Sequence, residues 1–426
     1  MEIEPLYSAF LRSSGVNTDS RSLKAGQMFW ALKGPNFNGN QFARQALELG
    51  AAFVVVDEET GIRDGRILKV KEGLRDLQKL AHHHRLVWGK EVIGICGSNG
   101  KTTTKELISR ALSTEKNVFS TPGNLNNHIG VPLSLLLLRP EHDIAVIEMG
   151  ANHTHEIEDL CYIAEPNAGL ITNIGKDHLE GFKTVKNTAN ANGELFDFLH
   201  DNLGTAFINT SDEWNMVLQS KIQKRFAFPK SGDNAEIQML ASDFFLRIAY
   251  KGETATTKLT GKYNFNNLAT ALAVSSFYKI DPKKALDAVA SYEPSNNRSQ
   301  IVKTEKNTVI SDAYNANPSS IMAALENLLE AKADNKIAIL GDMLELGKDS
   351  TKEHAALGEW AKNYPQIQFI VAGKEMKAFH SKYPSSTYFE LKDDLHQYAD
   401  QLKPEGALIL LKGSRGMKLE TLLAYL

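Results

Sequence analysis

Residues 97–103 read Gly97-Ser98-Asn99-Gly100-Lys101-Thr102-Thr103. The apolar run 92–95 precedes this glycine-rich stretch, and a helix-compatible segment, 103–112, follows it. A strand, a glycine loop and a helix in that order are the context of a phosphate-binding loop. The glycines allow backbone N–H groups to face an anion at the N-terminus of the helix. The stretch therefore predicts a nucleotide-binding domain built on a parallel sheet.

The side chains of this loop suit a nucleotide with bound magnesium. Lys101 is placed to reach the terminal phosphates, and the hydroxyl of Thr102 is placed to ligate Mg²⁺. The general pattern has a glycine five residues before Gly100, whereas this chain has Ile95 there. The alternative is a glycine-rich turn that holds no ligand. The strand and helix on either side favour the phosphate loop.

Length and composition indicate a multidomain enzyme. The chain has 426 residues, of which 42% are hydrophobic and 23% charged. A formal net charge of -3 gives no reason to expect a nucleic acid or an anionic membrane as a partner. The densest apolar run, 131–138, is too short to span a bilayer, and residues 1–5 do not resemble a secretory signal. Cys96 and Cys161 form no spaced framework, so we expect a cytoplasmic protein with free thiols.

Alternating strand and helix patterns predict three α/β domains, at 1–88, 89–293 and 294–426. The first is small, the central one is a doubly wound nucleotide-binding domain, and the last is Rossmann-like. A turn-rich segment at 292–297 is the predicted linker between the second and third domains. A helix is predicted at 41–49. The predicted strands are 27–32, 52–56, 144–148, 168–172, 205–208, 309–310, 337–340, 369–372 and 407–411.

Polar residues follow several of these strands. Glu148 ends the strand 144–148, at the carboxyl edge where open α/β sheets bind ligands, and suits a metal-binding carboxylate or a general base. His178 follows the next strand, where a lone histidine is more often a surface residue than a ligand. The occurrence of Lys101, Glu148 and His178 on successive strand ends favours one shared site.

The third domain shows the same pattern. Polar loops at 311–318, 340–347 and 411–416 each follow a predicted strand. Any one of them alone would be read as a solvated turn. Because three share one sheet edge, they predict a second ligand-binding face.

Together these motifs resemble the Mur ligase family over essentially the whole chain. The phosphate loop, Glu148 and His178 are similar to the whole superfamily, which includes the folylpolyglutamate synthases. Three loops are more specific and resemble the branch that adds D-alanyl-D-alanine: Thr-Pro-Gly-Asn-Leu-Asn-Asn at 121–127, Asp-Ala-Tyr-Asn-Ala-Asn-Pro at 312–318 and Gly-Asp-Met-Leu-Glu-Leu-Gly at 341–347. The sibling branch that adds the third peptide residue typically shows Asp-Tyr-Ala-His and Asp-Asn-Pro-Arg motifs, and the sequence contains neither.

The resemblance implies an ATP-dependent ligase of peptidoglycan synthesis. It would join D-alanyl-D-alanine to UDP-N-acetylmuramoyl-tripeptide, using ATP and Mg²⁺. The terminal carboxylate of the tripeptide attacks the γ-phosphate, giving an acyl phosphate and ADP, and the dipeptide amine then displaces phosphate through a tetrahedral intermediate. Two anions meet in the first step, so charge neutralisation is the main demand. The family also suggests a monomer.

The resemblance further assigns roles to residues of this chain. Catalysis is expected of Lys101, Glu148 and His178. The expected metal ligands are Thr102 and Glu148, with His178 at a second Mg²⁺. The expected ATP contacts are Gly97, Ser98, Asn99, Gly100, Lys101, Thr102, Thr103, Asn267 at the adenine, and Arg298 and Asp312 at the phosphates and ribose. The expected substrate contacts are Asp19, Ser20 and Arg21 in a uridine-binding loop, Asn124, Asn126, Asn127, Tyr314, Asn315 and Asn317, with Lys412, Ser414 and Arg415 at the dipeptide carboxylate. Domain closure is expected to complete this divided site.

One position departs from the family pattern. In the family a lysine stands before Gly-Glu-Leu in the helix after His178, and its carbamate supports the second Mg²⁺. This chain has Asn192 there, which cannot be carbamylated and offers only a neutral carbonyl. A water, another side chain or a weaker metal site takes its place, or the protein is impaired. The other motifs are intact and favour an active enzyme.

Two further hypotheses remain open at this point. The first is a related amide ligase that acts on another amino acid or on folate, against which the loops 19–21 and 315–318 count. The second, suggested by Asn192, is a nucleotide-binding protein without ligase turnover. Phosphate release that depends on D-alanyl-D-alanine separates the second from the ligase. The sequence does not decide between diaminopimelate and lysine as the third peptide residue.

Overall fold

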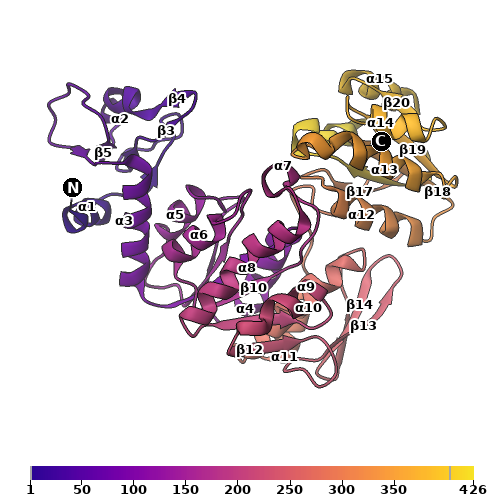
Figure 1. Ribbon diagram of the computed structural model, residues 1–426, viewed down its shortest axis with the longest axis horizontal. Coiled ribbons are helices and arrows are strands. Elements are labelled where there is room, and N and C mark those ends of the chain that lie inside the picture. Colours follow the sequence, from indigo (N-terminus) through magenta and orange to yellow (C-terminus); the bar gives the residue numbers. More distant parts are fainter. Residues whose placement is uncertain (1, 403) are drawn as a thin grey trace.

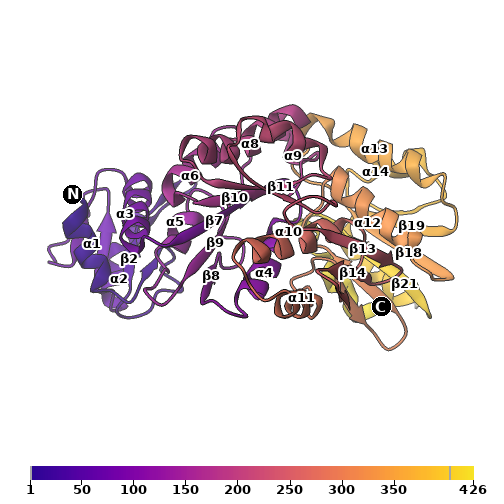
Figure 2. The ribbon, with the colours of Figure 1, turned by 90° about the horizontal axis from the view of Figure 1, so that it is seen from below.

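The computed structural model describes residues 2–402 and 404–426. Met1, the first residue of the segment considered above as a signal sequence, lies outside this range. The chain forms three α/β lobes that follow one another in a row, with the N-terminal lobe at one end and the C-terminal lobe at the other (Figures 1 and 2). The predicted three-domain α/β architecture is therefore confirmed, while the boundaries at 88/89 and 293/294 stay predictions.

The N-terminal lobe is built on a parallel sheet of order β1-β2-β5-β6, with a small β3-β4 ribbon beside it. The predicted strands at 27–32 and 52–56 are present as shorter elements, and the predicted helix at 41–49 is a 3₁₀ turn followed by α2. The elements are α1 (Ile3–Leu11), β1 (Val16–Asn17), β2 (Met28–Trp30), β3 (Lys33–Gly34), β4 (Phe37–Asn38), η1 (Gly39–Phe42), α2 (Ala43–Glu48), β5 (Phe53–Val56), β6 (Ile67–Lys69) and α3 (Gly73–Trp88).

The central lobe contains a parallel sheet of order β12-β11-β10-β7-β9-β8 and a separate antiparallel sheet, β13-β14-β15. Its elements are β7 (Glu91–Cys96), α4 (Lys101–Leu112), β8 (Val118–Ser120), α5 (Gly130–Leu135), β9 (Ile144–Glu148), α6 (Glu156–Ala164), β10 (Ala168–Ile171), α7 (Leu179–Phe182), α8 (Val185–Asp201), β11 (Thr205–Asn209), α9 (Glu213–Leu218), η2 (Gln219–Lys221), β12 (Lys224–Phe228), β13 (Ile237–Ser242), β14 (Leu246–Tyr250), β15 (Glu253–Thr256), α10 (Tyr263–Phe277) and α11 (Pro282–Ala290).

Strand β7 shows how this sheet is buried on both faces. Successive side chains of a strand point to opposite faces. Val92 and Cys96 belong to the cluster that packs under α5, α6 and α8, whereas Ile93 and Ile95 belong to the cluster under α4, α10 and α11. Ile95, which stands where the general phosphate-loop pattern has a glycine, is therefore a core residue of the strand.

The C-terminal lobe has a sheet of order β16-β17-β21-β18-β19-β20, in which only β16 runs antiparallel to its neighbour among the described strands. Its elements are β16 (Gln300–Lys303), β17 (Thr308–Asp312), α12 (Pro318–Glu330), β18 (Asn335–Gly341), η3 (Gly347–Asp349), α13 (Ser350–Ala361), β19 (Ile367–Ala372), α14 (Lys377–Lys382), β20 (Thr387–Phe389), α15 (Lys392–Leu402), β21 (Ala407–Lys412), η4 (Arg415–Met417) and η5 (Leu419–Tyr425).

Helix α3 joins the first two lobes (Figure 1). Leu80, in the middle of the helix, is fully buried in a single apolar cluster that also contains Phe10 of the N-terminal lobe and Leu135 of the central lobe. Near its end, Arg85 Nε donates to the carbonyl of Ala164 at 2.8 Å. The two lobes therefore share one continuous core. Of the helices in the described part of the chain, none has both the length and the apolar composition needed to cross a membrane.

Candidate active site

The phosphate loop lies between β7 and α4 and is bonded to the end of β10. Gly97 has a φ of +126°, and a Cβ there would lie 2.2 Å from Oγ1 of Thr172, so only glycine fits this position. The N–H of Ser98 donates to the carbonyl of Asn173 at 2.9 Å, and Thr172 Oγ1 donates to the carbonyl of Asn99 at 2.7 Å. These bonds fix the shape of the loop before any phosphate binds.

Lys101 is the first residue of α4 and bends back over this loop. Its Nζ donates to the carbonyl of Gly97 and, at 3.2 Å, to the carbonyl of Ser98. The ammonium group thus lies at the N-terminus of the helix, where backbone N–H groups also favour an anion. A phosphate at this position would find both a cation and free backbone donors.

Glu148 and Thr102 meet in the interior of the site. The Glu148 carboxylate is 2% exposed; its Oε2 accepts a hydrogen bond from Thr102 Oγ1 at 2.9 Å, and its Oε1 accepts one from Asn126 Nδ2 at 2.8 Å. Because β7 and β9 are neighbouring parallel strands, their carboxyl ends bring the two residues together. The sequence anticipated the neighbourhood of Thr102 and Glu148, and the structure adds Asn126 as a direct partner.

Lys105 is a further member of this cluster that the sequence analysis missed. Its side chain is 2% exposed, and its Nζ lies 3.6 Å from Glu148 Oε2 and donates to the carbonyl of Thr121 at 2.8 Å. The available signal was its spacing, since residues four apart lie on the same face of a helix and Lys105 follows Lys101 by that distance. The buried carboxylate therefore has a cation close by.

The oxygen atoms of Thr102 and Glu148 suit a hard cation such as Mg²⁺. Within residues 2–402 and 404–426, no group of three or more His, Cys, Asp or Glu side chains is arranged to hold a metal ion. Mg²⁺ commonly binds through one or two protein oxygens, with water and substrate phosphates as its other ligands. The pair Thr102 and Glu148 fits that mode of binding.

Asn267 comes from α10 and lies against the phosphate loop. Its Oδ1 accepts a hydrogen bond from Thr104 Oγ1 at 3.0 Å, and a Cβ on Gly100 would come within 2.6 Å of the same atom. Its Nδ2 donates to Asn264 Oδ1 at 2.8 Å. Asn267 therefore connects α10 to the first turn of α4. Its contact with adenine stays a prediction.

His178 faces the C-terminal lobe. Its Nδ1 lies 2.8 Å from Oε2 of Glu345, and this hydrogen bond holds the pKa of Glu345 below its ordinary value. Among the described residues, no hydrogen bond or ion pair joins His178 to Glu148. Its expected role at a second Mg²⁺ stays a prediction; with Nδ1 bonded to Glu345, the ring would bind the metal through Nε2.

Asn192 is buried on α8 behind the phosphate loop. The side chain is 4% exposed, and its Nδ2 donates to the carbonyl of Thr188 one turn earlier at 2.8 Å. The thiol of Cys96, the last residue of β7, lies 3.4 Å from the Asn192 carbonyl. The backbone of Asn192 therefore lies beside the strand that carries the loop, while its correspondence to the carbamylated lysine of the family stays a prediction.

In the C-terminal lobe, Lys412 forms an internal ion pair. Its Nζ lies 2.7 Å from Oδ2 of Asp312 and 3.2 Å from the carbonyl of Asn315, and its side chain is 2% exposed. Asp312 Oδ1 also accepts the N–H of Ser299 at 3.1 Å. The structure thus gives the Lys412 ammonium partners within its own lobe, rather than leaving it free for a substrate carboxylate.

Two arginines of this lobe lie against one aromatic ring. The guanidinium carbon of Arg298 is 3.6 Å from the centre of the Tyr314 ring, and that of Arg415 is 5.1 Å from it. Arg415 Nη1 also lies 3.3 Å from the Tyr314 hydroxyl. Ser414 Oγ accepts the N–H of Leu344 at 2.8 Å, which holds two of the predicted ligand loops together.

The 312–318 loop reaches the phosphate loop across the lobe boundary. Asn317 Nδ2 donates to Oδ1 of Asn99 at 2.9 Å, while Asn317 Oδ1 caps α12 by accepting the N–H of Ser320 at 2.8 Å. Residues predicted from separate domains to share one site are therefore in contact at this point.

The remaining residues predicted to contact substrate lie in two lobes: Asp19, Ser20 and Arg21 in the N-terminal lobe, and Asn124 and Asn127 in the central lobe. Arg21 Nη2 is 2.6 Å from Asp19 Oδ2, and this hydrogen bond lowers the pKa of Asp19 to about 2. Ser20 is buried between them, whereas Asn124 is exposed. Asn127 Oδ1 accepts the N–H of Gly130, the first residue of α5, at 2.8 Å.

A cavity of about 750 Å³ lies near the carboxyl edge of the N-terminal sheet, between this lobe and α6. Asp19 and Arg21 follow β1 at that same sheet edge. No single motif of the sequence marks this cavity, because its basic side chains come from separate strand ends and from α3. Those basic residues are Lys33, Lys71, Arg75, Lys79 and His82.

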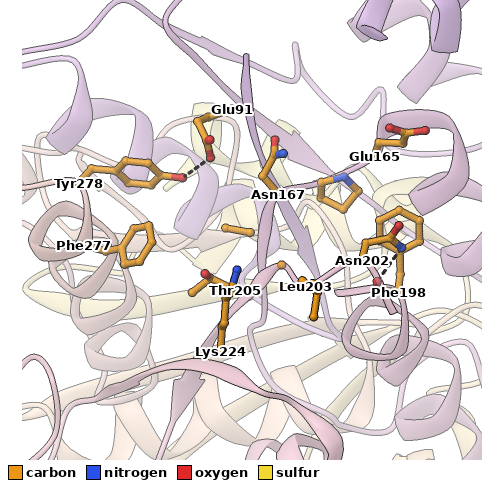
Figure 3. A pocket seen from close by; sticks show the side chains of 13 residues that line it. Glu91, Glu165, Asn167, Phe198, Asn202, Leu203, Thr205, Lys224, Phe277 and Tyr278 are labelled. Carbon is orange, nitrogen blue, oxygen red and sulfur yellow. Dashed lines mark hydrogen bonds between the residues drawn. The ribbon is translucent and has the colours of Figure 1, made fainter. Parts of the chain in front are cut away.

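A second cavity of about 590 Å³ lies at the opposite edge of the central sheet (Figure 3). Glu91, Thr205 and Lys224, which line it, are the first residues of β7, β11 and β12. The Tyr278 hydroxyl donates to Glu91 Oε2 at 3.4 Å. Since the phosphate loop follows the carboxyl end of β7, this cavity is not part of the candidate site.

The fold and the site together define a three-domain α/β protein with a nucleotide-binding site between its lobes. Family models described as "Mur ligase family, catalytic domain", "Mur ligase middle domain" and "Mur ligase, glutamate ligase domain" match residues 12–84, 95–275 and 297–415. The chain belongs to the Mur ligase family.

Its relatives are similar over nearly their whole length. The chain is 34% identical to the UDP-N-acetylmuramoyl-tripeptide–D-alanyl-D-alanine ligase of Bacillus subtilis, with 95% of this chain and 91% of the relative covered. It is also 34% identical to the ligase of the same name from Escherichia coli, with 97% and 94% covered.

Solved structures agree with this relationship. MurF from Acinetobacter baumannii has a TM-score of 0.88 at 28% identity, with 99% of this chain and 97% of that chain covered. MurF from Thermotoga maritima in complex with ADP has a TM-score of 0.85 at 26% identity, with 98% and 97% covered.

Proposed function

We propose that this protein joins D-alanyl-D-alanine to UDP-N-acetylmuramoyl-tripeptide at the expense of ATP, giving the pentapeptide precursor of peptidoglycan. Relatives of that name share nearly the full length of the chain. The observation that carries the proposal is the 2.9 Å hydrogen bond between Asn317 and Asn99. Through it, a loop distinctive of this branch of the family meets the phosphate loop common to all of it.

The reaction begins between two anions, the tripeptide carboxylate and the γ-phosphate of ATP. Lys101 lies where it would bind the phosphate charge, and charge stabilisation of this kind is a main source of rate in phosphoryl transfer. Mg²⁺ held by Thr102 and Glu148 would neutralise further phosphate charge. Asn126 and Lys105 hold the Glu148 carboxylate in place from two sides.

Transfer of the phosphoryl group gives an acyl phosphate and ADP. The amine of D-alanyl-D-alanine then forms the new C–N bond, loses its proton, and the C–O bond to phosphate breaks. Arg415, held against Tyr314, would bind the dipeptide carboxylate, because a guanidinium group can bind both oxygens of a carboxylate. Lys412 would not contact the dipeptide itself; it would hold the Asp312 carboxylate in position through their ion pair.

The nucleotide end of the muramyl peptide would bind the N-terminal lobe. Asp19 and Arg21 lie at the carboxyl edge of its sheet. A cavity at the same edge is lined by Lys33, Lys71, Arg75 and Lys79, together with the carboxylates Asp57, Glu72 and Asp159, and these four cations could bind the diphosphate. We further propose that the enzyme is cytoplasmic and that it acts as a monomer. Light scattering of the purified protein would test the monomeric state.

A phosphate-release assay tests the function. ATP and Mg²⁺ are combined with UDP-N-acetylmuramoyl-tripeptides that end in diaminopimelate or in lysine, and with D-alanyl-D-alanine, D-alanine or L-alanyl-L-alanine. The proposal expects release only when a tripeptide and D-alanyl-D-alanine are both present. Release with a different amino acid or with a folate would favour a related amide ligase. Binding of ATP without release under any condition would favour the protein without turnover.

A further inference from the structure

The segment between β10 and α8, residues 172–184, contacts the phosphate loop on one side. The N–H of Gly175 donates to Ser98 Oγ at 2.9 Å, and Ser98 Oγ donates to Asp177 Oδ1 at 2.8 Å. Asp177 is only 5% exposed. The conformation of this segment therefore determines where the side chain of Ser98 lies in the phosphate loop.

On its other side, the same segment contacts the C-terminal lobe. Lys176 Nζ lies 2.8 Å from one carboxylate oxygen of Glu353 and 3.0 Å from the other, and the N–H of Lys176 donates to Ser319 Oγ at 2.9 Å. A Cβ on Gly175 would lie 2.7 Å from Ser319 Oγ, so a larger residue there would have to displace this side chain. Lys176 thus binds the C-terminal lobe through both its side chain and its backbone N–H.

The Lys176–Glu353 ion pair is asymmetric in burial. The side chain of Glu353, on α13, is 8% exposed, whereas that of Lys176 is 47% exposed. A largely buried carboxylate that loses its cation remains desolvated and unpaired, which disfavours the arrangement that buries it. The contact is therefore formed fully only when the C-terminal lobe is seated on the segment.

We propose that Lys176 and Glu353 are positioning residues that couple the seating of the C-terminal lobe to the shape of the phosphate loop, and so to nucleotide affinity. Neither residue belongs to the site described above. The coupling runs from Glu353 to Lys176, through Gly175 and Asp177, to Ser98. Because such coupling is reciprocal, a bound nucleotide also favours the seated lobe. The inference rests on the ATP site of the proposed function.

The chain offers a matched control. Lys262 at the start of α10 and Glu330 at the end of α12 form a second ion pair between the same two lobes, with Nζ 2.6 Å from Oε1. Both side chains are about half exposed, at 54% and 45%, and no contact described for them reaches the phosphate loop. Reversing this pair changes the same kind of charge at the same lobe boundary without changing the segment 172–184.

The experiment compares Lys176→Glu, Glu353→Lys and the doubly reversed protein with the same three variants of Lys262 and Glu330. Isothermal titration with ADP and Mg²⁺ gives nucleotide affinity, and small-angle scattering gives the radius of gyration with and without ADP. Each single reversal at 176 or 353 should weaken ADP binding about fivefold or more, and the double reversal should restore most of the loss. The control variants should change affinity less than about twofold.

Several results would overturn the proposal. The first is an unchanged ADP affinity in Lys176→Glu. The second is a loss of ADP affinity in the Lys262 and Glu330 variants as large as that in the Lys176 and Glu353 variants. The third is a double reversal that binds ADP no more tightly than the single variant with the lower affinity. If Glu353→Lys does not fold, Lys176→Glu and Lys176→Met still decide, because Lys176 is half exposed. ADP binding does not need a peptide substrate, so failure of the ligase assay leaves this test valid.

Discussion

Lys101 is the residue on which the proposed chemistry most depends. It lies over the carbonyls of Gly97 and Ser98, at the helix N-terminus where a γ-phosphate would bind. Lys101→Ala removes the only side-chain cation of the segment 97–103. We expect turnover in the phosphate-release assay to fall by roughly 10²–10³-fold, the loss typical of a removed electrostatic contact to a transition state. An unchanged unfolding midpoint is the control, and near-normal turnover would remove Lys101 from the mechanism.

Asn192 sets a second expectation at the residue scale. Its amide donates within its own helix and carries no amine that CO₂ can modify. We expect the rate to be the same with added and with depleted bicarbonate, and the enzyme to need more Mg²⁺ than a relative with lysine there, because amide oxygen binds hard cations more weakly than carboxylate. A Mg²⁺ titration in bicarbonate-free and bicarbonate-supplemented buffer checks both.

The opposite result would identify another lysine. Lys186 lies on α8 six residues before Asn192, about 120° away around the helix at roughly 100° per residue. Lys183 precedes α8 and is not restricted by this geometry. Bicarbonate activation, with a carbamate detected on either lysine, would show that one of them has replaced the missing group.

The pairing of site residues was predictable where it depends on sheet order alone. Thr102 and Glu148 follow neighbouring parallel strands, so their proximity was expected from the pattern. The pairs His178–Glu345 and Lys412–Asp312 were not expected. The His178–Glu345 pair depends on the position of the C-terminal lobe relative to the central lobe. The Lys412–Asp312 pair depends on the register of β17 and β21, which places these two residues side by side.

Helix α3 connects the N-terminal lobe to the central lobe. Leu80 is fully buried in the core that they share, whereas Leu86 on the same helix is 49% exposed. We expect Leu80→Ala to lower the free energy of unfolding by about 2–5 kcal/mol, as for other buried leucines, and Leu86→Ala to change it by less than about 0.5 kcal/mol. Urea unfolding followed by circular dichroism measures both.

The same experiment reports on cooperativity. Because the core is continuous through α3, the N-terminal and central lobes should lose stability together in Leu80→Ala. The chain has four tryptophans, so Trp88, Trp214 and Trp360 are first replaced by Phe. The fluorescence of Trp30, buried in the N-terminal lobe, should then follow the same transition as the circular dichroism of the whole chain. A Trp30 transition that shifts alone would show that α3 belongs to the N-terminal lobe only.

At the element scale, the sequence predicted the buried strands well and the exposed ones poorly. The runs 144–148 and 407–411 correspond to β9 and β21, because a fully buried strand is a continuous apolar run. The sheet β13-β14-β15 was not predicted. Only Ile237 of β13 is buried, so this strand offers no such run, and its pairing comes from contacts with the strands around it.

For the whole molecule, the proposal assigns each lobe to one substrate, which kinetics can separate. Arg21→Ala should raise the KM for the UDP-muramyl peptide and leave that for ATP little changed, because the N-terminal lobe has no phosphate loop of its own. Arg415→Lys should raise the KM for D-alanyl-D-alanine most, since lysine cannot bind a carboxylate through two parallel hydrogen bonds. Steady-state kinetics with each substrate varied in turn checks both variants.

The two variants control for each other, since each should leave the other's substrate unaffected. A change in the ATP dependence of Arg21→Ala would mean that the N-terminal lobe has been assigned the wrong substrate. An unchanged dipeptide dependence in Arg415→Lys would give the loop 411–416 another role.

The central claim is that ATP activates the tripeptide carboxylate for attack by the dipeptide amine. The most direct test uses UDP-N-acetylmuramoyl-tripeptide labelled with ¹⁸O at both oxygens of its terminal carboxylate, incubated with ATP, Mg²⁺ and D-alanyl-D-alanine. Mass spectrometry should find one ¹⁸O atom in each phosphate released, together with the UDP-muramyl-pentapeptide. Unlabelled phosphate, or release of phosphate without pentapeptide, would contradict the account.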